Sequence, residues 1–192
     1  MEINTQKTLN KRLLIPMLIA LVGAILMTTA VFMPYSVAIG DRAAYIEEYP
    51  DEVVFDEISL TAKDMMSISM VKYAHIYNTL SESYWGSKDA GIFYVVIVSL
   101  IGGFSLLAVL FSAVKKPIAI IIFDVLAFAV FCIQNLDFTE RGVIPSSSYD
   151  WGIGYYVFFG AAAVALIGAV WMLVKKIIIK RQLKTADNAQ KK

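Results

Sequence analysis

The sequence predicts an all-α membrane protein, a four-transmembrane-helix bundle with a long first extracellular segment. Three observations predict this fold class. First, 58% of the 192 residues are hydrophobic and 17% are charged, whereas soluble domains average about 45–50% and about 25%. Second, four apolar segments are long enough to cross a bilayer. Third, lysine and arginine are unevenly distributed among the segments that connect them.

The four predicted spans are residues 13–38, 91–114, 117–136 and 152–174. A helix needs about 20 predominantly apolar residues to cross the hydrocarbon core. The third segment is the shortest and contains Asp124, so it is the least secure of the four. We interpret the first as a retained span, because its apolar run exceeds the roughly 7–15 residues of a secretory signal.

The basic residues predict the orientation of these spans. Twelve of the 17 lysines and arginines lie in 1–12, 115–116 and 175–192, and the other five lie in 39–90 and 137–151. Cytoplasmic loops carry the excess of basic residues. Both termini are therefore predicted to be cytoplasmic, with the chain in the plasma membrane and the segments 39–90 and 137–151 outside. The basic tail fits a helix extension that is attracted to anionic lipid headgroups.

The composition argues against several functional classes. The chain has one cysteine, Cys132, and one histidine, His75. An intrachain disulfide and a metal site built from several such ligands are therefore impossible. The acidic residues of 41–57 match no EF-hand spacing, and we interpret them as a solvated face. We expect no cofactor, no metal, no nucleic-acid partner and no enzymatic activity, because the usual catalytic pairs are missing.

The outer segment 39–90 contains one amphipathic pattern, which predicts a helix over about 61–82. Thr61 and Asp64 resemble a capping pair at its start. Five apolar residues then follow at spacings of 4, 3, 4 and 3, which places them on one stripe: Met66, Met70, Tyr73, Tyr77 and Leu80. A stripe rich in methionine and tyrosine suits an adaptable partner-binding surface. The alternative is that it packs on the outer ends of the protein's own spans or lies on the membrane.

Asp124 is the one acidic residue inside a predicted span. It lies eight residues from Lys116, about 12 Å deep at about 1.5 Å per residue. Such residues are costly and usually have a partner or a function. Ser105, about 15 Å deep on the second span, is the best-placed hydroxyl. Three roles remain open: a structural hydrogen bond to Ser105 or to a helix carbonyl, a proton or cation relay, and pairing with a basic residue of another subunit.

Small residues on three spans predict close helix packing, because helices in lipid associate where their backbones can approach. Packing within one chain is the default use of such residues, and contact between copies is the second. The residues are Ala20, Ala24, Gly102, Gly103, Gly160, Ala161, Ala165, Gly168 and Ala169.

The order of four spans, two inner termini, a long first outer loop and a short second one resembles the claudin and peripheral-myelin-protein class. That class has a tryptophan motif and a cysteine pair in its first outer loop. Here Trp85-Gly86 is isolated and 39–90 has no cysteine. The resemblance therefore covers the layout of the chain and none of the motifs, and a shared layout does not carry function.

Two functional hypotheses follow. The first is a non-catalytic accessory, scaffold or partner-binding subunit, which acts through its extracellular segment on a membrane protein or on a second copy of the chain. The alternative is a small oligomeric transporter or proton-coupled carrier that uses Asp124. The carrier needs a second polar residue at the depth of Asp124, and Ser105 is the candidate.

Overall fold

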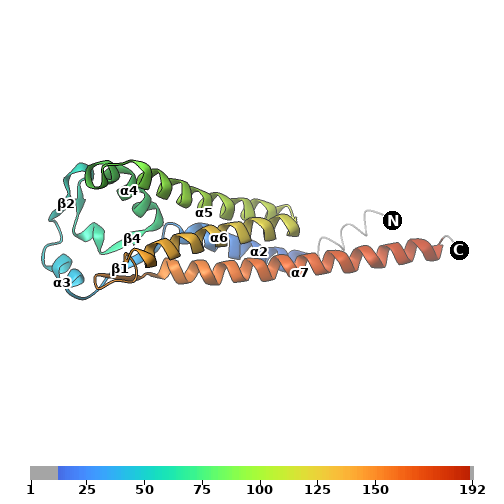
Figure 1. The fold of residues 1–192 in the computed structure, drawn as a ribbon. Coiled ribbons are helices and arrows are strands. Elements are labelled where there is room, and N and C mark those ends of the chain that lie inside the picture. Colours follow the sequence, from blue (N-terminus) through green and yellow to red (C-terminus); the bar gives the residue numbers. More distant parts are fainter. Residues whose placement is uncertain (1–12, 191–192) are drawn as a thin grey trace.

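Helices form most of the molecule. The computed structural model describes residues 13–190, so the predicted arm 1–12 lies outside the described residues. In the described part, short strands and turns link six α-helices (Figure 1). They are α2 (Leu14–Ala30), α3 (Gly40–Glu48), α4 (Met70–Trp85), α5 (Asp89–Ala113), α6 (Pro117–Glu140) and α7 (Ile153–Gln190).

Three of these helices are long and apolar enough to cross a membrane: α5, α6 and, over Ile153–Leu183, α7. The fourth apolar helix, α2, has only 17 residues. The predicted span 13–38 is therefore wrong at its end, because the helix stops at Ala30 and strand β1 (Pro34–Ala38) follows. Proline lacks the amide proton that a continuing helix needs. The first apolar segment, rather than the third, forms the shortest of the four helices.

Two long helices extend past their predicted ends. α6 continues to Glu140, so the connection predicted over 137–151 is shorter than expected. α7 does not end near residue 174 but runs to Gln190, and its 38 residues make it about 57 Å long at about 1.5 Å per residue. Figure 1 shows the end of α7 extending beyond the neighbouring helices. The predicted helical extension of the tail is confirmed as far as residue 190.

The long helices pack side by side: α2 contacts α5 and α7, and α6 contacts the same two helices. Between α2 and α7 the backbones touch. A Cβ atom at Gly23 would lie 2.8 Å from the carbonyl oxygen of Ala161, and one at Gly168 would lie 2.8 Å from the Cα of Ala20. The predicted use of small residues for packing within the chain is thus confirmed at this interface, as expected where side chains do not separate the helices.

A cap of short elements covers one end of the long helices (Figure 1). Strand β1 is the centre of a three-stranded antiparallel sheet, between β4 (Ser67–Ser69) and β5 (Tyr149–Trp151). A separate hairpin pairs β2 (Val53–Phe55) with β3 (Leu60–Thr61). The helical class is confirmed, but the all-α prediction is wrong because three short segments that are far apart in the sequence pair into this sheet. Helix α3 also belongs to the cap and had no predicted counterpart.

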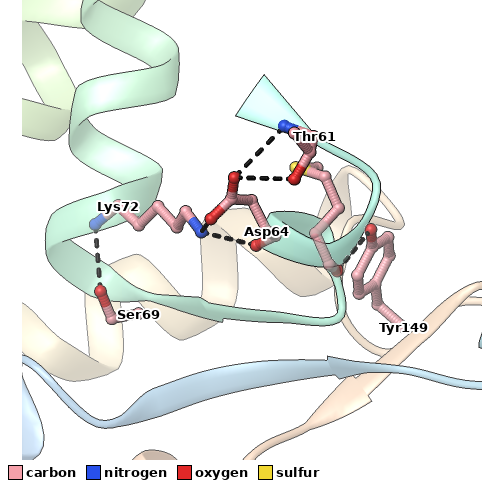
Figure 2. A network of polar contacts seen from close by, with 6 residues as sticks. Thr61, Asp64, Ser69, Lys72 and Tyr149 are labelled. Carbon is pink, nitrogen blue, oxygen red and sulfur yellow. Dashed lines mark hydrogen bonds and ion pairs between the residues drawn. The ribbon is translucent and has the colours of Figure 1, made fainter. Parts of the chain in front are cut away.

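Helix α4 begins nine residues later than predicted. Its N-cap is Ser69, whose hydroxyl accepts a hydrogen bond from the backbone N–H of Lys72 at 3.1 Å. Thr61 does donate to the Asp64 carboxylate, through both its backbone N–H and its hydroxyl, but this pair closes a separate 3-10 turn. Figure 2 shows that the Thr61–Asp64 pair and the Ser69–Lys72 pair are joined, because the Lys72 ammonium donates to the Asp64 carboxylate at 3.0 Å.

Aromatic rings fill the space between the cap and the helices. The buried Tyr35 of β1 contacts five other rings, with centroid distances of 5.4–6.5 Å: Tyr73, Phe131, Phe138, Trp151 and Tyr155. Its hydroxyl donates to the side-chain oxygen of Asn135. Burial raises the pKa of both Tyr35 and Tyr73, so both phenols stay neutral at physiological pH. The cap is therefore fixed to the long helices through apolar and hydrogen-bonded contacts together.

Candidate functional site

Asp124 lies at the bottom of a groove between α6 and α7. Its side chain is only 2% exposed, and its oxygen Oδ1 has no hydrogen-bond partner among the described residues. The groove has a volume of about 330 Å³. Its other lining residues are all apolar: Val125 and Phe128 on α6, and Phe159, Ala162, Ala163 and Leu166 on α7.

The structure does not pair Asp124 with Ser105. Ser105 is fully buried, but its hydroxyl donates to the carbonyl of Ile101 at 2.7 Å, one turn earlier in α5. No hydrogen bond joins the two predicted site residues within the described part of the chain. The hydrogen bond that was predicted between Asp124 and a neighbouring span is therefore not made by Oδ1.

A second groove lies nearer the basic end of the same two helices. It has a volume of about 450 Å³, and its lining includes Ile118 and Ile122 of α6, Leu173 of α7 and two lysines, Lys116 and Lys176. Because Ile118, Ile122 and Val125 are spaced by four and three residues, they lie on one face of α6. Both grooves thus follow the same side of the α6–α7 pair, with lysines at one end and Asp124 farther along.

The predicted partner-binding stripe is largely inside the protein. Met70, Tyr73, Tyr77 and Leu80 are between 0% and 8% exposed, and Met66 is half-buried against the same core. On the other side of α4 the Lys72 side chain is 27% exposed. The predicted amphipathic helix is confirmed over Met70–Leu80, and so is the alternative that its stripe packs on the chain's own helices. The stripe is not an open contact surface.

Two buried polar residues were missed in the sequence analysis. Gln134 is fully buried, and neither polar atom of its side chain has a partner among the described residues. Asn135 accepts the hydrogen bond from Tyr35. Both lie on the buried side of α6, together with Asp124 and Phe131. A signal was present, because two consecutive amide side chains inside an apolar segment are unusual.

A polar network fastens the C-terminal end of α6 to α5. Arg141 donates to the Asp137 carboxylate at 2.8 Å, and the hydroxyl of Tyr94 contacts both of these residues. The guanidinium also lies 5.4 Å from the ring centroid of Tyr77 on α4. The three residues satisfy one another, so this network stabilises the helix ends and leaves no open site.

Acidic residues do not converge into a metal site in the described part of the chain. Within residues 13–190, no three His, Cys, Asp or Glu side chains lie close enough together to hold a metal ion. No protein-family model, curated protein or solved structure matches the chain.

Proposed function

We propose that this chain is a four-span membrane protein of the plasma membrane that acts as a non-catalytic accessory or scaffold subunit and contacts its partner inside the bilayer. One observation carries this proposal: the buried carboxyl oxygen Oδ1 of Asp124 has no partner within the described chain, and Asp124 lines a groove on the side of the helices. A buried acceptor left unpaired costs about 1–3 kcal/mol. A protein retains such an unpaired acceptor where a second molecule supplies the missing hydrogen bond.

The assignment of α2 as a fourth span rests on length and packing. Its 17 residues extend about 26 Å at about 1.5 Å per residue, close to the roughly 30 Å of the hydrocarbon core. Ala20 and Gly23 lie against Gly168 and Ala165 of α7, so α2 occupies the same depth as a candidate span. Four spans leave both ends of the chain on one side, and the basic residues favour the cytoplasm.

The accessory role draws support from the way in which the polar groups are used. Tyr35 of β1 donates a hydrogen bond to Asn135 of α6, and the hydroxyls of Ser36 and Tyr73 bond each other. The methionine and tyrosine stripe, which was the expected contact surface, belongs to the core. We therefore place the partner contact in the membrane, at the groove between α6 and α7, rather than on the extracellular segment.

A proton-coupled carrier is the second candidate, and the same unpaired carboxyl favours it. A relay needs further polar groups that lead from Asp124 toward water. The residues that line its groove are otherwise apolar, and the hydroxyl of Ser105 is bonded to its own helix. These two facts make the accessory role the better-supported proposal.

Purification from native membranes tests the proposal. In a mild detergent we expect a complex of fixed stoichiometry that contains a second membrane protein, measured by native mass spectrometry. Asp124→Leu should dissociate this complex, while Val22→Leu, on the exposed side of α2, should leave it intact. A protein that purifies alone and admits protons into reconstituted vesicles, with the proton flux lost in Asp124→Asn, would establish the carrier instead.

A further inference from the structure

We propose that the groove between α6 and α7 docks a single transmembrane helix of the partner, and that this helix presents a hydrogen-bond donor to Oδ1 of Asp124. The inference deepens the proposed accessory function and rests on it. It specifies the chemistry of the contact: an apolar helix with one polar side chain, such as asparagine, serine or arginine, at the depth of Asp124.

The position of Asp124 requires a donor. Asp124 is 98% buried by the protein and its Oδ1 has no partner among the described residues, yet the residue lines a groove whose other lining residues are apolar. Lipid acyl chains carry no hydrogen-bond donors, so a lipid in the groove would leave this oxygen unpaired. A transmembrane helix can carry a donor to this depth, because polar side chains bond across helices in membranes.

The surface of α7 beside the groove suits a helix. Gly160 is exposed, and a Cβ atom added there would meet nothing within 4 Å. Ala163, one turn farther along, is exposed and lines the groove. Small residues at this spacing allow a second helix backbone to approach closely. Ala163 and Asp124 line the same groove, so the close approach and the hydrogen bond occur on the same face.

A second copy of this chain is a poorer occupant than a different protein. In the sequence, Val22 lies ten residues from Arg12, Leu106 nine from Lys115 and Ile167 eight from Lys175, comparable to the eight residues between Asp124 and Lys116. The three residues are 50–62% exposed. All three are apolar. The nearby hydroxyls of Ser105 and Ser112 are buried and bonded to their own helices. These three exposed positions of α2, α5 and α7 therefore offer no donor to a neighbouring copy.

Two synthetic helices provide a direct test with the full-length protein in phospholipid vesicles. One is a leucine-rich transmembrane peptide with a single central asparagine, and the other is the same peptide with leucine at that position. A photoreactive residue at Ala163 reports on the groove, and one at Leu106 on α5 is the matched control. We expect the asparagine peptide to crosslink at Ala163 about tenfold more than the leucine peptide, and neither peptide to show a preference at Leu106.

Two variants of Asp124 identify the interaction. Asp124→Leu should remove the preference for the asparagine peptide, whereas Asp124→Asn keeps an acceptor and should retain most of it. Thermal unfolding of each variant shows that the fold is intact. The inference is overturned if both peptides crosslink equally at Ala163, if the preference survives in Asp124→Leu, or if copies of the protein crosslink to each other there without peptide.

This test is separate from the test of the accessory function. If the peptide preference is observed but the native protein purifies alone, the groove recognises helices and the accessory function fails. If a native complex forms but the peptides show no preference, the accessory function stands and its contact lies elsewhere.

Discussion

At the scale of single residues, Asp124 departs from ordinary membrane-protein chemistry, as the fully buried and unpaired amide of Gln134 also does. A hydroxyl such as that of Ser112 is buried at no net loss, because it donates to the carbonyl of Ala108 at 2.7 Å. Oδ1 of Asp124 has no such arrangement. Buried polar groups are normally paired, so its side chain represents a local loss of stability that the isolated protein does not recover.

Replacing this residue should stabilise the isolated protein. In detergent, without a partner, Asp124→Leu is expected to raise the free energy of unfolding by about 1–3 kcal/mol, since it removes an unpaired buried acceptor. Asp124→Asn should change it little, because the amide keeps both size and polarity. Thermal or denaturant unfolding of the three proteins measures this. A marked loss of stability in Asp124→Leu would mean that the carboxyl serves an internal partner.

Asp64 provides a pH-dependent contribution in the cap. Hydrogen bonds from the Lys72 ammonium and from Thr61 lower its pKa below the usual value. A carboxyl whose folded-state pKa is lowered stabilises the fold above its unfolded pKa, and this contribution is lost as the pH falls through the folded value. The side chains of Lys72 and Asp64 are 27% and 46% exposed, so solvent screening keeps their contribution to the stability small.

Asp64→Asn is therefore expected to lower the free energy of unfolding by about 0.2–1 kcal/mol at pH 7. The difference from the unmodified protein should shrink as the pH is lowered below about 4. Unfolding curves at pH 7 and at successively lower pH values measure the effect. Asp64→Asn in a Lys72→Met background is the control and should cost less, because the charged partner is absent.

At the scale of elements, the contact between α2 and α7 determines how the shortest apolar helix is held. Gly23 and Gly168 allow the two backbones to touch, which gives a 17-residue helix extensive dispersion contact without large side chains. Gly102 and Gly103 of α5 and the exposed Gly160 of α7 have open space where a Cβ would be. Glycines with the same pattern in the sequence thus have different roles.

Adding a single methyl group separates these roles. Gly23→Ala should lower the free energy of unfolding by about 1–3 kcal/mol, because the new Cβ overlaps the backbone of α7. Gly160→Ala, on the same pair of helices, should be neutral or stabilising by up to about 1 kcal/mol, since alanine favours the helix and meets nothing. Unfolding in detergent compares the two. Equal effects would show that α2 and α7 do not pack as described.

At the scale of the whole molecule, the cap and the long helices form one unit. Strand β1 follows α2 directly and pairs with β4 and with β5, while Tyr35 of the same strand bonds Asn135 of α6. The segments before α5 and after α6 are thereby joined at one end. This arrangement requires that both segments lie on the same side of the membrane, as the charge distribution also predicts.

The four-span topology can be measured with single cysteines in a Cys132→Ser background. An impermeant thiol reagent applied to intact cells should label Glu57→Cys and Ser147→Cys, which are exposed in the cap. It should not label Gln182→Cys near the end of α7 until the membrane is permeabilised. An N-terminal epitope tag should be hidden in the same way. A tag that is accessible on intact cells would leave α2 outside the membrane and three spans in place of four.

The sequence by itself determined the helical class, the apolar helices and the stripe of α4, because hydropathy and periodicity are local properties of the chain. Ala20 and Ala24 of α2 and the small residues of α7 were also identified from the sequence, whereas Gly23 was not. Asp124 was recognised as unusual for the same reason, since a carboxyl in an apolar run needs no structure to be noticed.

Only the tertiary structure decided how these features are used. The sheet pairs residues 34–38 with 67–69 and 149–151, and strands this short, which pair across long separations, leave no local periodicity to read. Burial of the stripe depends on which neighbours α4 meets. Whether Asp124 finds Ser105 depends on the rotation of α5, which points that hydroxyl at its own backbone. Side-chain partners are set by the packing of whole helices, and a local pattern does not contain that information.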